Sequence, residues 1–448
     1  MFKVESLFRA VMRNGAILLG GRVANAILGL AALGIAGRSL GLAGFGVIVL
    51  VQAFAEAVGE IAKFQSWQTV LRYGARPLAD GDTANFQRVL RFTGLLDVIS
   101  SAGGVAIGVV GCLVLGPWLK WPAEITPTAM LFSTSIAFMV TATPFGVLRL
   151  FDRFDLLAGQ VPVASVVRLI GGVIAVVLHG GLAAFLAVWW AGTLAGFVFL
   201  VAAAWRELHR RGMLKGLDLR RGPLTAGFPG AWKFALTTNA SATVAMAQEQ
   251  ISTLMVGGLL NPAQAGLWRV AEMFADAIAS PANMVITALY PELAKLNAAG
   301  DNHGLGRLAG QVAIAFGAAG GFLLLLTMVA GRSVLVLTMG QPFAAAAPVL
   351  TWLAAALVLA MWALPLEPVL VSTGRAGASL RIRLVVAVCY VTALVPMVRR
   401  FGVAGAGAAA VGASALLATG MLLAVVQWRR DVRLPRLGAA ARSTEAVS

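Results

Sequence analysis

Residues 40–58 read LGLAGFGVIVLVQAFAEAV, and residues 260–278 read LNPAQAGLWRVAEMFADAI. At a constant offset of 220 the two stretches share several residues, and Glu56 falls on Asp276. The shared pairs include Leu40 with Leu260, Gly46 with Gly266, and Phe54 with Phe274. Each stretch contains an apolar helix with an acidic residue near its middle. The chain is therefore predicted to be a duplication of one helical unit.

The composition is that of a membrane protein. Of the 448 residues, 59% are hydrophobic and 12% are charged, whereas soluble domains contain about 25% charged residues. Twelve apolar stretches recur along the chain, and as a helix each can cross a hydrocarbon layer roughly 30 Å thick. The predicted spans are 15–37, 44–63, 94–116, 128–148, 159–179, 181–204, 233–258, 266–289, 309–330, 345–372, 382–398 and 403–427.

The spans divide evenly between the two copies. An even number of spans in each half keeps both repeats in the same orientation, with the symmetry axis along the membrane normal. We predict an all-α polytopic membrane protein of about 12 transmembrane helices, built as two six-helix bundles in a parallel pseudo-two-fold repeat. The predicted parts are an N-terminal bundle at 1–204, a basic cytoplasmic linker at 205–232, a C-terminal bundle at 233–428 and a disordered cytoplasmic tail at 429–448.

The basic residues are distributed asymmetrically, and the formal net charge is +16. If the amino terminus is cytoplasmic, 27 of the 35 lysines and arginines lie in cytoplasmic segments. This is the pattern of the positive-inside rule, so both termini are predicted to be cytoplasmic and no nucleic acid is expected as a partner. The first span is expected to act as its own signal anchor. Cys112 and Cys389 lie in different halves, so the sequence predicts no disulfide framework.

The first two spans carry polar side chains at helical spacing. Arg22 and Asn25 share one face of the first span, and Gln52, Glu56 and Glu60 follow each other at i, i+4 on the second. Charged groups at this depth are costly and are expected to face protein, water or a ligand. Two interpretations of Glu56 stay open, a titratable coupling site and a structural ion pair. For Arg22 the alternative is snorkelling to the membrane surface.

The corresponding spans of the second half are polar as well. Asn239 and Gln250 lie on one face of the seventh span, which cannot favourably face lipid. On the eighth span Arg269, Glu272 and Asp276 follow at i, i+3 and i+7, so a simple pair between Arg269 and Glu272 is an alternative to a ligand site. Two further intramembrane charges are Arg168 in the fifth span and Glu367 in the tenth.

This concentration of polar groups on spans 1, 2, 7 and 8 indicates a transporter, because polar helix faces need a water-filled cavity between the two halves. The sequence contains no Walker A pattern, and its three histidines show no metal-ligand spacing. Outer loops are too short for an extramembranous catalytic segment. We therefore expect neither an enzyme nor a cofactor or metal site.

The sequence resembles the polysaccharide flippases of the multidrug/oligosaccharidyl-lipid/polysaccharide exporter superfamily. The resemblance spans roughly residues 10–428 and is carried by the six-plus-six repeat, by the two stretches quoted above, and by LPLEPVLVSTGRAGASLRIR after the tenth span. It implies a V-shaped bundle whose central cavity carries an undecaprenyl-pyrophosphate-linked oligosaccharide across the bacterial inner membrane. Glu56 departs from relatives that flip the peptidoglycan precursor, where this position tends to be basic.

The resemblance implies roles for the polar residues. Cavity arginines would meet the pyrophosphate, and Arg22 and Arg269 match them best. Glu56 and Asp276 are the leading candidates for coupling to a proton or cation gradient. The complete substrate-binding set is Arg22, Asn25, Arg168, Asn239, Gln250 and Arg269, and the complete coupling set is Glu56, Asp276, Glu60, Glu272 and Glu367.

Two other functions remain open from the sequence. One is a multidrug or cation antiporter of the same superfamily, which the acidic second and eighth spans favour and the intramembrane arginines disfavour. The other is a scaffold of a polysaccharide-assembly complex that transports nothing. For the flippase, the expected partners are the lipid-linked oligosaccharide, membrane lipids, and polysaccharide polymerase and assembly proteins, with a monomer as the transporting unit.

Overall fold

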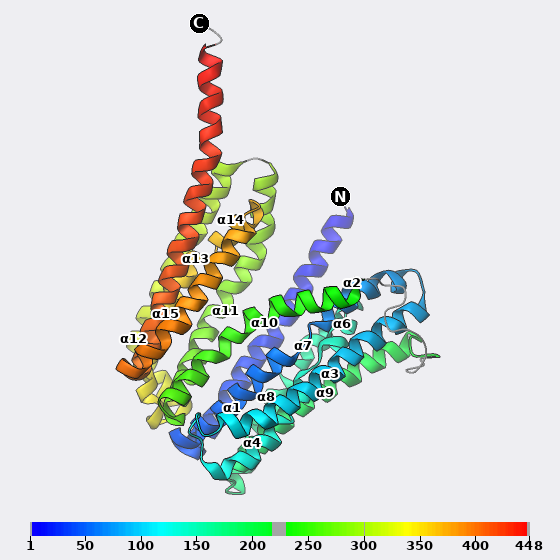
Figure 1. Ribbon diagram of the computed structural model, residues 1–448, viewed down its shortest axis with the longest axis vertical. Coiled ribbons are helices and arrows are strands. Elements are labelled where there is room, and N and C mark those ends of the chain that lie inside the picture. Colours follow the sequence, from blue (N-terminus) through cyan, green and yellow to red (C-terminus); the bar gives the residue numbers. More distant parts are fainter. Residues whose placement is uncertain (1, 217–229, 300, 446–448) are drawn as a thin grey trace. The chain divides into compact units, whose positions relative to one another are not determined.

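The computed structural model describes residues 2–216, 230–299 and 301–445 (Figure 1), and every regular element in these ranges is a helix. The predicted all-α membrane fold is confirmed. The elements are α1 (Phe2–Ala62), α2 (Ser66–Ala79), α3 (Thr83–Leu115), η1 (Ala123–Ile125), α4 (Thr126–Ser133), α5 (Ile136–Met139), α6 (Ala142–Leu150), α7 (Phe154–Gln160), α8 (Val163–Val177), α9 (Leu182–Arg210), α10 (Ala231–Leu259), α11 (Pro262–Ala298), α12 (Asn302–Met339), η2 (Gln341–Ala346), α13 (Ala347–Ala363), α14 (Leu366–Ser372) and α15 (Ala376–Glu445).

All twelve predicted spans fall on these helices. Eight continuous segments of the described chain are long and apolar enough to cross a membrane. Two of them each contain two predicted spans, because α1 and α15 turn at a glycine in the left-handed region of backbone conformation. These glycines are Gly41, with φ 67°, and Gly402, with φ 62°. A residue with a Cβ would be strained at either position.

The structure divides into two compact units. The first comprises residues 1–266 and 338–340, and the second comprises residues 267–337 and 341–448. In the first unit α8 packs against α1 and α9, and α10 packs against α1. In the second unit α13 and α14 pack against α15. The predicted division into bundles at 1–204 and 233–428 stays a prediction, and part of the predicted linker lies outside the described residues.

The carboxy-terminal segment is helical further than the sequence suggests. We expect disorder from residue 429, but the backbone of α15 continues as a helix to Glu445. Alanine, arginine and leucine, which favour helices, supply much of this segment, and this accounts for the extension.

The helices are apolar on the outside, as the membrane requires. On α3 the inward positions carry small or polar residues such as Ser100, Gly104 and Gly108, whereas Val98 and Ile107 are more than half exposed. A Cβ on Gly104 would come within 2.7 Å of the Ile136 side chain. Small residues thus let α3 approach its neighbours closely, and large apolar side chains face outward, where lipid replaces water as the solvent.

The fourth span is broken inside the membrane. Because Pro144 lacks a backbone N–H, the sequence predicts that it interrupts this span. The break lies just before it, at the extended Val140 and at Thr141, and Pro144 occupies the first turn of α6. A proline is tolerated in a first turn because the N–H it lacks would be unpaired there. The break leaves N–H groups at the start of α6 that need another acceptor.

The closest helix approach in the duplicated stretch lies at Gly46. A Cβ at this position would overlap the carbonyl group of Pro262, at the start of α11. We expect Gly46→Ala to lower the free energy of unfolding by about 1–3 kcal/mol, the usual cost of overpacking a close contact. The measurement is the apparent unfolding temperature of the purified protein in detergent.

Gly94→Ala is the matched control, because Gly94 lies within α3 and a Cβ there meets nothing within 4 Å. This variant should be neutral or slightly more stable, since alanine favours a helix over glycine. Equal unfolding temperatures for Gly46→Ala and Gly94→Ala would contradict the close approach.

Candidate functional site

A layer of polar side chains crosses the first unit at one depth. The chain reverses direction at Gly41, so residues equally far from it on the two parts of α1 lie at similar depth (Figure 1). Asn25 precedes Gly41 by 16 residues and Glu56 follows it by 15. At about 1.5 Å per residue both are more than 20 Å from the turn. The polar groups predicted on the first two spans therefore belong to one level of the bundle.

Asn25 joins the first part of α1 to α8. The Ser165 hydroxyl donates a hydrogen bond of 2.8 Å to Oδ1 of Asn25. Gly29 lies one turn further along α1, and a Cβ there would be in ordinary van der Waals contact with the Ser165 Oγ atom, at 3.5 Å. Ser165 is buried. The pair orients the face of α8 that carries Arg168, one turn after Ser165.

Arg168 is an incompletely paired guanidinium group within the membrane span. Its Nη2 atom donates to the Thr193 hydroxyl at 3.3 Å, and its Cζ atom lies 5.7 Å from the centre of the Trp189 ring. Its buried Nε atom has no hydrogen-bond partner among the described residues. A Cβ on Gly192 would press on this side chain, so α9 leaves room for it only because residue 192 is glycine. The arginine is held in place but retains donor capacity.

Glu56 supplies the negative charge near this arginine. Its carboxylate interacts electrostatically with Arg168 and accepts a hydrogen bond of 2.7 Å from the Gln52 side chain. Gln52 and Glu56 are four residues apart, and this i, i+4 spacing places them on the same helix face, as the sequence predicts. Glu56 thus has a hydrogen-bond donor in Gln52 and a longer-range electrostatic partner in Arg168.

Gln250 lies on α10, which packs against α1. Gly257 of this helix contacts Leu50 of α1, and Gln250 precedes Gly257 by about two turns. Gln250 is buried, and its Oε1 atom has no hydrogen-bond partner among the described residues. The predicted residue Asn239, on the same helix, lies among side chains outside the described part.

Three of the residues that the sequence selects, Asn25, Glu56 and Arg168, lie in this layer with Ser165. Gln250 lies on α10, which packs against the same helix α1. Arg22 lies one turn before Asn25 on α1 and is exposed. These residues present two guanidinium groups, an acid, two amides and a hydroxyl. Such a set can bind a phosphate through the guanidinium group and sugar hydroxyls through the amides.

The second unit carries the matching acidic stripe on α11. Arg269 donates a hydrogen bond of 2.8 Å to Glu272, which is the local pair that the spacing allows. Asp276 is exposed and interacts electrostatically with Arg269. The duplicated acids Glu56 and Asp276 thus each lie near an arginine within their own unit.

Two other predicted coupling residues form ion pairs. Glu60 pairs with Lys63 at 2.7 Å. Glu367 is bound by Arg383, whose Nε atom donates at 3.0 Å while Nη2 contacts the second oxygen, and Ser379 donates at 3.3 Å. These contacts hold α14 against the start of α15. They favour a structural role for Glu367, at the point where the tenth span is broken before Leu366.

Asp97 is a buried acid that the sequence does not single out as a site residue. Asp97 lies on α3, is buried, and its Oδ2 atom accepts a hydrogen bond of 2.8 Å from the backbone N–H of Thr143. It thereby caps the first turn of α6 after the break in the fourth span. The sequence contains two signals, an acid inside the third span and a proline inside the fourth, but the separation of 46 residues between Asp97 and Thr143 gives no sign of contact.

We expect Asp97→Ala to lower the free energy of unfolding by about 1–2 kcal/mol, because it leaves the Thr143 N–H without an acceptor. Asp97→Asn should lose less than half of this, since an amide oxygen still accepts. The measurement is the apparent unfolding temperature in detergent, with the exposed Asp80→Ala as control. If the alanine and asparagine variants lost equal stability, the capping role would be wrong.

The chain matches a known protein family and a known inner membrane protein. Residues 11–297 match the family described as "Polysaccharide biosynthesis protein". The chain is 35% identical over 297 residues to the inner membrane protein YghQ of Escherichia coli (strain K12), which covers 65% of this chain and 82% of that protein.

Solved structures support the same fold. An inward-facing MATE family multidrug resistance transporter of the MOP superfamily is similar with a TM-score of 0.73 and 14% identity, covering 92% of this chain and 95% of its own. The lipid II flippase MurJ in an inward closed conformation is similar with a TM-score of 0.66 and 11% identity, covering 92% and 87%. The predicted family resemblance is confirmed: the chain belongs to the polysaccharide biosynthesis protein family and has the fold of the MOP superfamily.

Proposed function

We propose that this protein is a flippase that moves undecaprenyl-pyrophosphate-linked oligosaccharide repeat units across the bacterial inner membrane. The units would be used to assemble lipopolysaccharide or exopolysaccharide. Family membership supports a membrane transport step in polysaccharide biosynthesis. The observation that carries the proposal is Arg168, an intramembrane guanidinium group with unused donor capacity beside neutral polar side chains and the carboxylate of Glu56.

The pyrophosphate would bind at Arg168. A diphosphate is the part of such a substrate that a low-dielectric span excludes most strongly, so its passage requires a positive group within the membrane. A guanidinium group binds phosphate oxygens by charge-assisted hydrogen bonds. Arg22, exposed one turn from Asn25, is proposed as the first contact on the predicted cytoplasmic side, and Arg269 as its counterpart in the second unit.

The sugars would be held by neutral donors and acceptors. Asn25, Gln250 and Asn239 offer amide groups, which can accept from and donate to sugar hydroxyls. Neutral groups suit a carrier that must also release its substrate, because their hydrogen bonds contribute only about 0.5–1.5 kcal/mol each.

Coupling is proposed to act through the charge of Glu56. In the absence of substrate this carboxylate is the counter-charge of Arg168. A diphosphate bound at Arg168 would take over the guanidinium group and repel the carboxylate, and a proton or cation could then neutralise Glu56. Asp276 is proposed to play the equivalent part beside Arg269. The two halves would rock about the axis between them to give alternating access.

Multidrug or cation exchange remains the second candidate function. It is favoured by Glu56 and by the exposed Asp276, which would attract a cationic compound. Arg168 disfavours it, because an unsatisfied guanidinium group repels a cation bound in the same layer. Accumulation of lipid-linked oligosaccharide in a strain lacking the protein would distinguish the flippase from both the exporter and a scaffold that transports nothing.

We expect Arg168→Gln to reduce polymer export about 10- to 100-fold, which corresponds to the loss of one charged hydrogen bond of about 1.5–3 kcal/mol. The measurement is surface polymer in a deletion strain carrying the variant, at equal protein level in the membrane. Arg168→Lys should retain part of the activity. The exposed Arg399→Gln is the matched control and should export normally. Normal export by Arg168→Gln would exclude Arg168 from the transport site.

We expect Glu56→Gln and Asp276→Asn together to abolish the dependence of transport on the proton gradient. The amides keep size and hydrogen bonding but cannot change charge. The measurement is uptake of lipid-linked oligosaccharide in proteoliposomes with and without an imposed gradient. If the double variant transported at the wild-type rate and still responded to the gradient, both assignments would be wrong. Glu292→Gln is the control, because Glu292 is an exposed acid that pairs with Lys295.

A further inference from the structure

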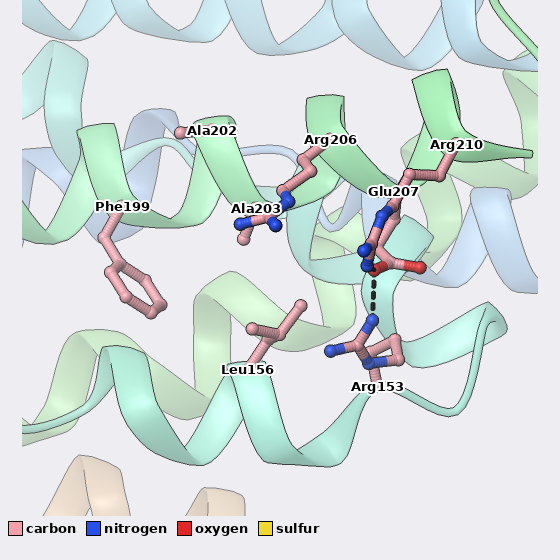
Figure 2. Close-up of a pocket in the computed structure, with 8 residues that line it drawn as sticks. All are labelled: Arg153, Leu156, Phe199, Ala202, Ala203, Arg206, Glu207 and Arg210. Carbon is pink, nitrogen blue, oxygen red and sulfur yellow. Dashed lines mark hydrogen bonds and ion pairs between the residues drawn. The ribbon is translucent and has the colours of Figure 1, made fainter.

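A separate pocket lies between α7 and α9, away from the polar layer. Its volume is about 370 Å³, and Figure 2 shows three arginines gathered around it: Arg153 from the segment before α7, and Arg206 and Arg210 from the end of α9. Leu156 and Phe199 line its apolar side. The pocket combines a basic rim with an apolar wall.

The basic rim is held by one carboxylate. Glu207, with a side chain 7% exposed, forms a hydrogen-bonded ion pair with Arg153 (Figure 2) and lies 3.8 Å from Arg210 and 3.6 Å from Arg211. The hydrogen bonds of Arg153 to Asp155, together with its ion pair with Glu207, keep the pKa of Arg153 above its usual value, so the group stays charged. Arg206 has no carboxylate partner among the described residues.

The charges of the cluster do not cancel. Two acids, Glu207 and Asp155, face four arginines, namely Arg153, Arg206, Arg210 and Arg211. The excess positive charge has no counterpart among the described side chains of the pocket. An anion is the ligand that would complete it.

The residue pattern along α9 indicates that the pocket lies near a membrane surface. Phe199 precedes Arg206 by two helical turns on α9, so the pocket changes from apolar to basic over about 10 Å. Trp205, which is 58% exposed, marks this level, since tryptophan prefers the boundary between headgroups and acyl chains. A ligand that fits must therefore be amphipathic, with an anionic end and an apolar body.

We propose that this pocket binds an anionic phospholipid from the leaflet on the arginine-rich side, which the charge asymmetry predicts to be the cytoplasmic one. The phosphate group accepts hydrogen bonds from Arg206 and Arg210, and an acyl chain lies against Leu156 and Phe199. Anionic lipids are attracted to basic clusters at this surface by about 1 kcal/mol per charge. The bound lipid links α7 to α9 and stabilises the first unit, independently of any transported substrate.

The test measures the unfolding temperature of the full-length protein in neutral detergent, with added phosphatidylglycerol or phosphatidylcholine. A ligand that binds only the folded state raises this temperature. We expect phosphatidylglycerol to raise it and phosphatidylcholine to have a much smaller effect. Arg206→Gln should bind phosphatidylglycerol about tenfold more weakly, as expected for one charged hydrogen bond. The affinity of Arg206→Lys for phosphatidylglycerol should lie between those of the wild type and Arg206→Gln, because lysine keeps the charge.

Controls separate this pocket from general charge effects. Arg76→Gln removes a positive charge from the exposed end of α2 and should respond to lipid as the wild type does. Phe199→Ala should weaken the response to phosphatidylglycerol, and soluble glycerol phosphate should give none. The proposal would be overturned if Arg206→Gln matched Arg76→Gln, if phosphatidylcholine were equally effective, or if glycerol phosphate replaced the lipid.

Discussion

Charge inside a hydrocarbon layer must be neutralised by other parts of the protein, and this constraint shapes both units. Apolar side chains face outward along the spans, as on α3, where Val98 and Ile107 are exposed and Gly104 is turned inward. The burial of apolar groups therefore cannot by itself specify which helices meet, because lipid is as apolar as leucine. Glycine contacts and polar pairs supply that specificity, as at Gly46 and at Asn25 with Ser165.

The same constraint separates the structural charges from those available for transport. Asp97 caps the broken fourth span, and Glu367 is bound by Arg383. The fold provides each carboxylate with a donor, although Oδ1 of Asp97 has no hydrogen-bond partner among the described residues. Arg168 differs, because its partners are a hydroxyl at 3.3 Å, an aromatic ring and a carboxylate at longer range. Incomplete satisfaction in a polar layer is what leaves capacity for a ligand.

Features set by local spacing could be predicted from the sequence. The twelve predicted spans all fall on helices, and the i, i+4 and i, i+3 spacing anticipated the contacts of Gln52 with Glu56 and of Arg269 with Glu272. Contacts between distant segments could not be predicted in this way. The cap of Asp97 on Thr143, and the groups around the pocket between α7 and α9, depend on how helices cross. Periodicity says nothing about crossing, because it reports only which residues share a face.

In each copy of the repeat, the acid lies near an arginine that acts as its counter-charge. Glu56 and Asp276 occupy the same position of the repeat, but their arginines do not. At the offset of 220, Arg168 falls on Val388 and Arg269 falls on Val49. Glu56 interacts with an arginine from α8, whereas Asp276 interacts with one on its own helix, two turns earlier. Both copies have the acid at the same position of the repeat, whereas their arginines lie at different positions. The physical requirement is therefore a positive group near the acid, and not a particular helix that carries it.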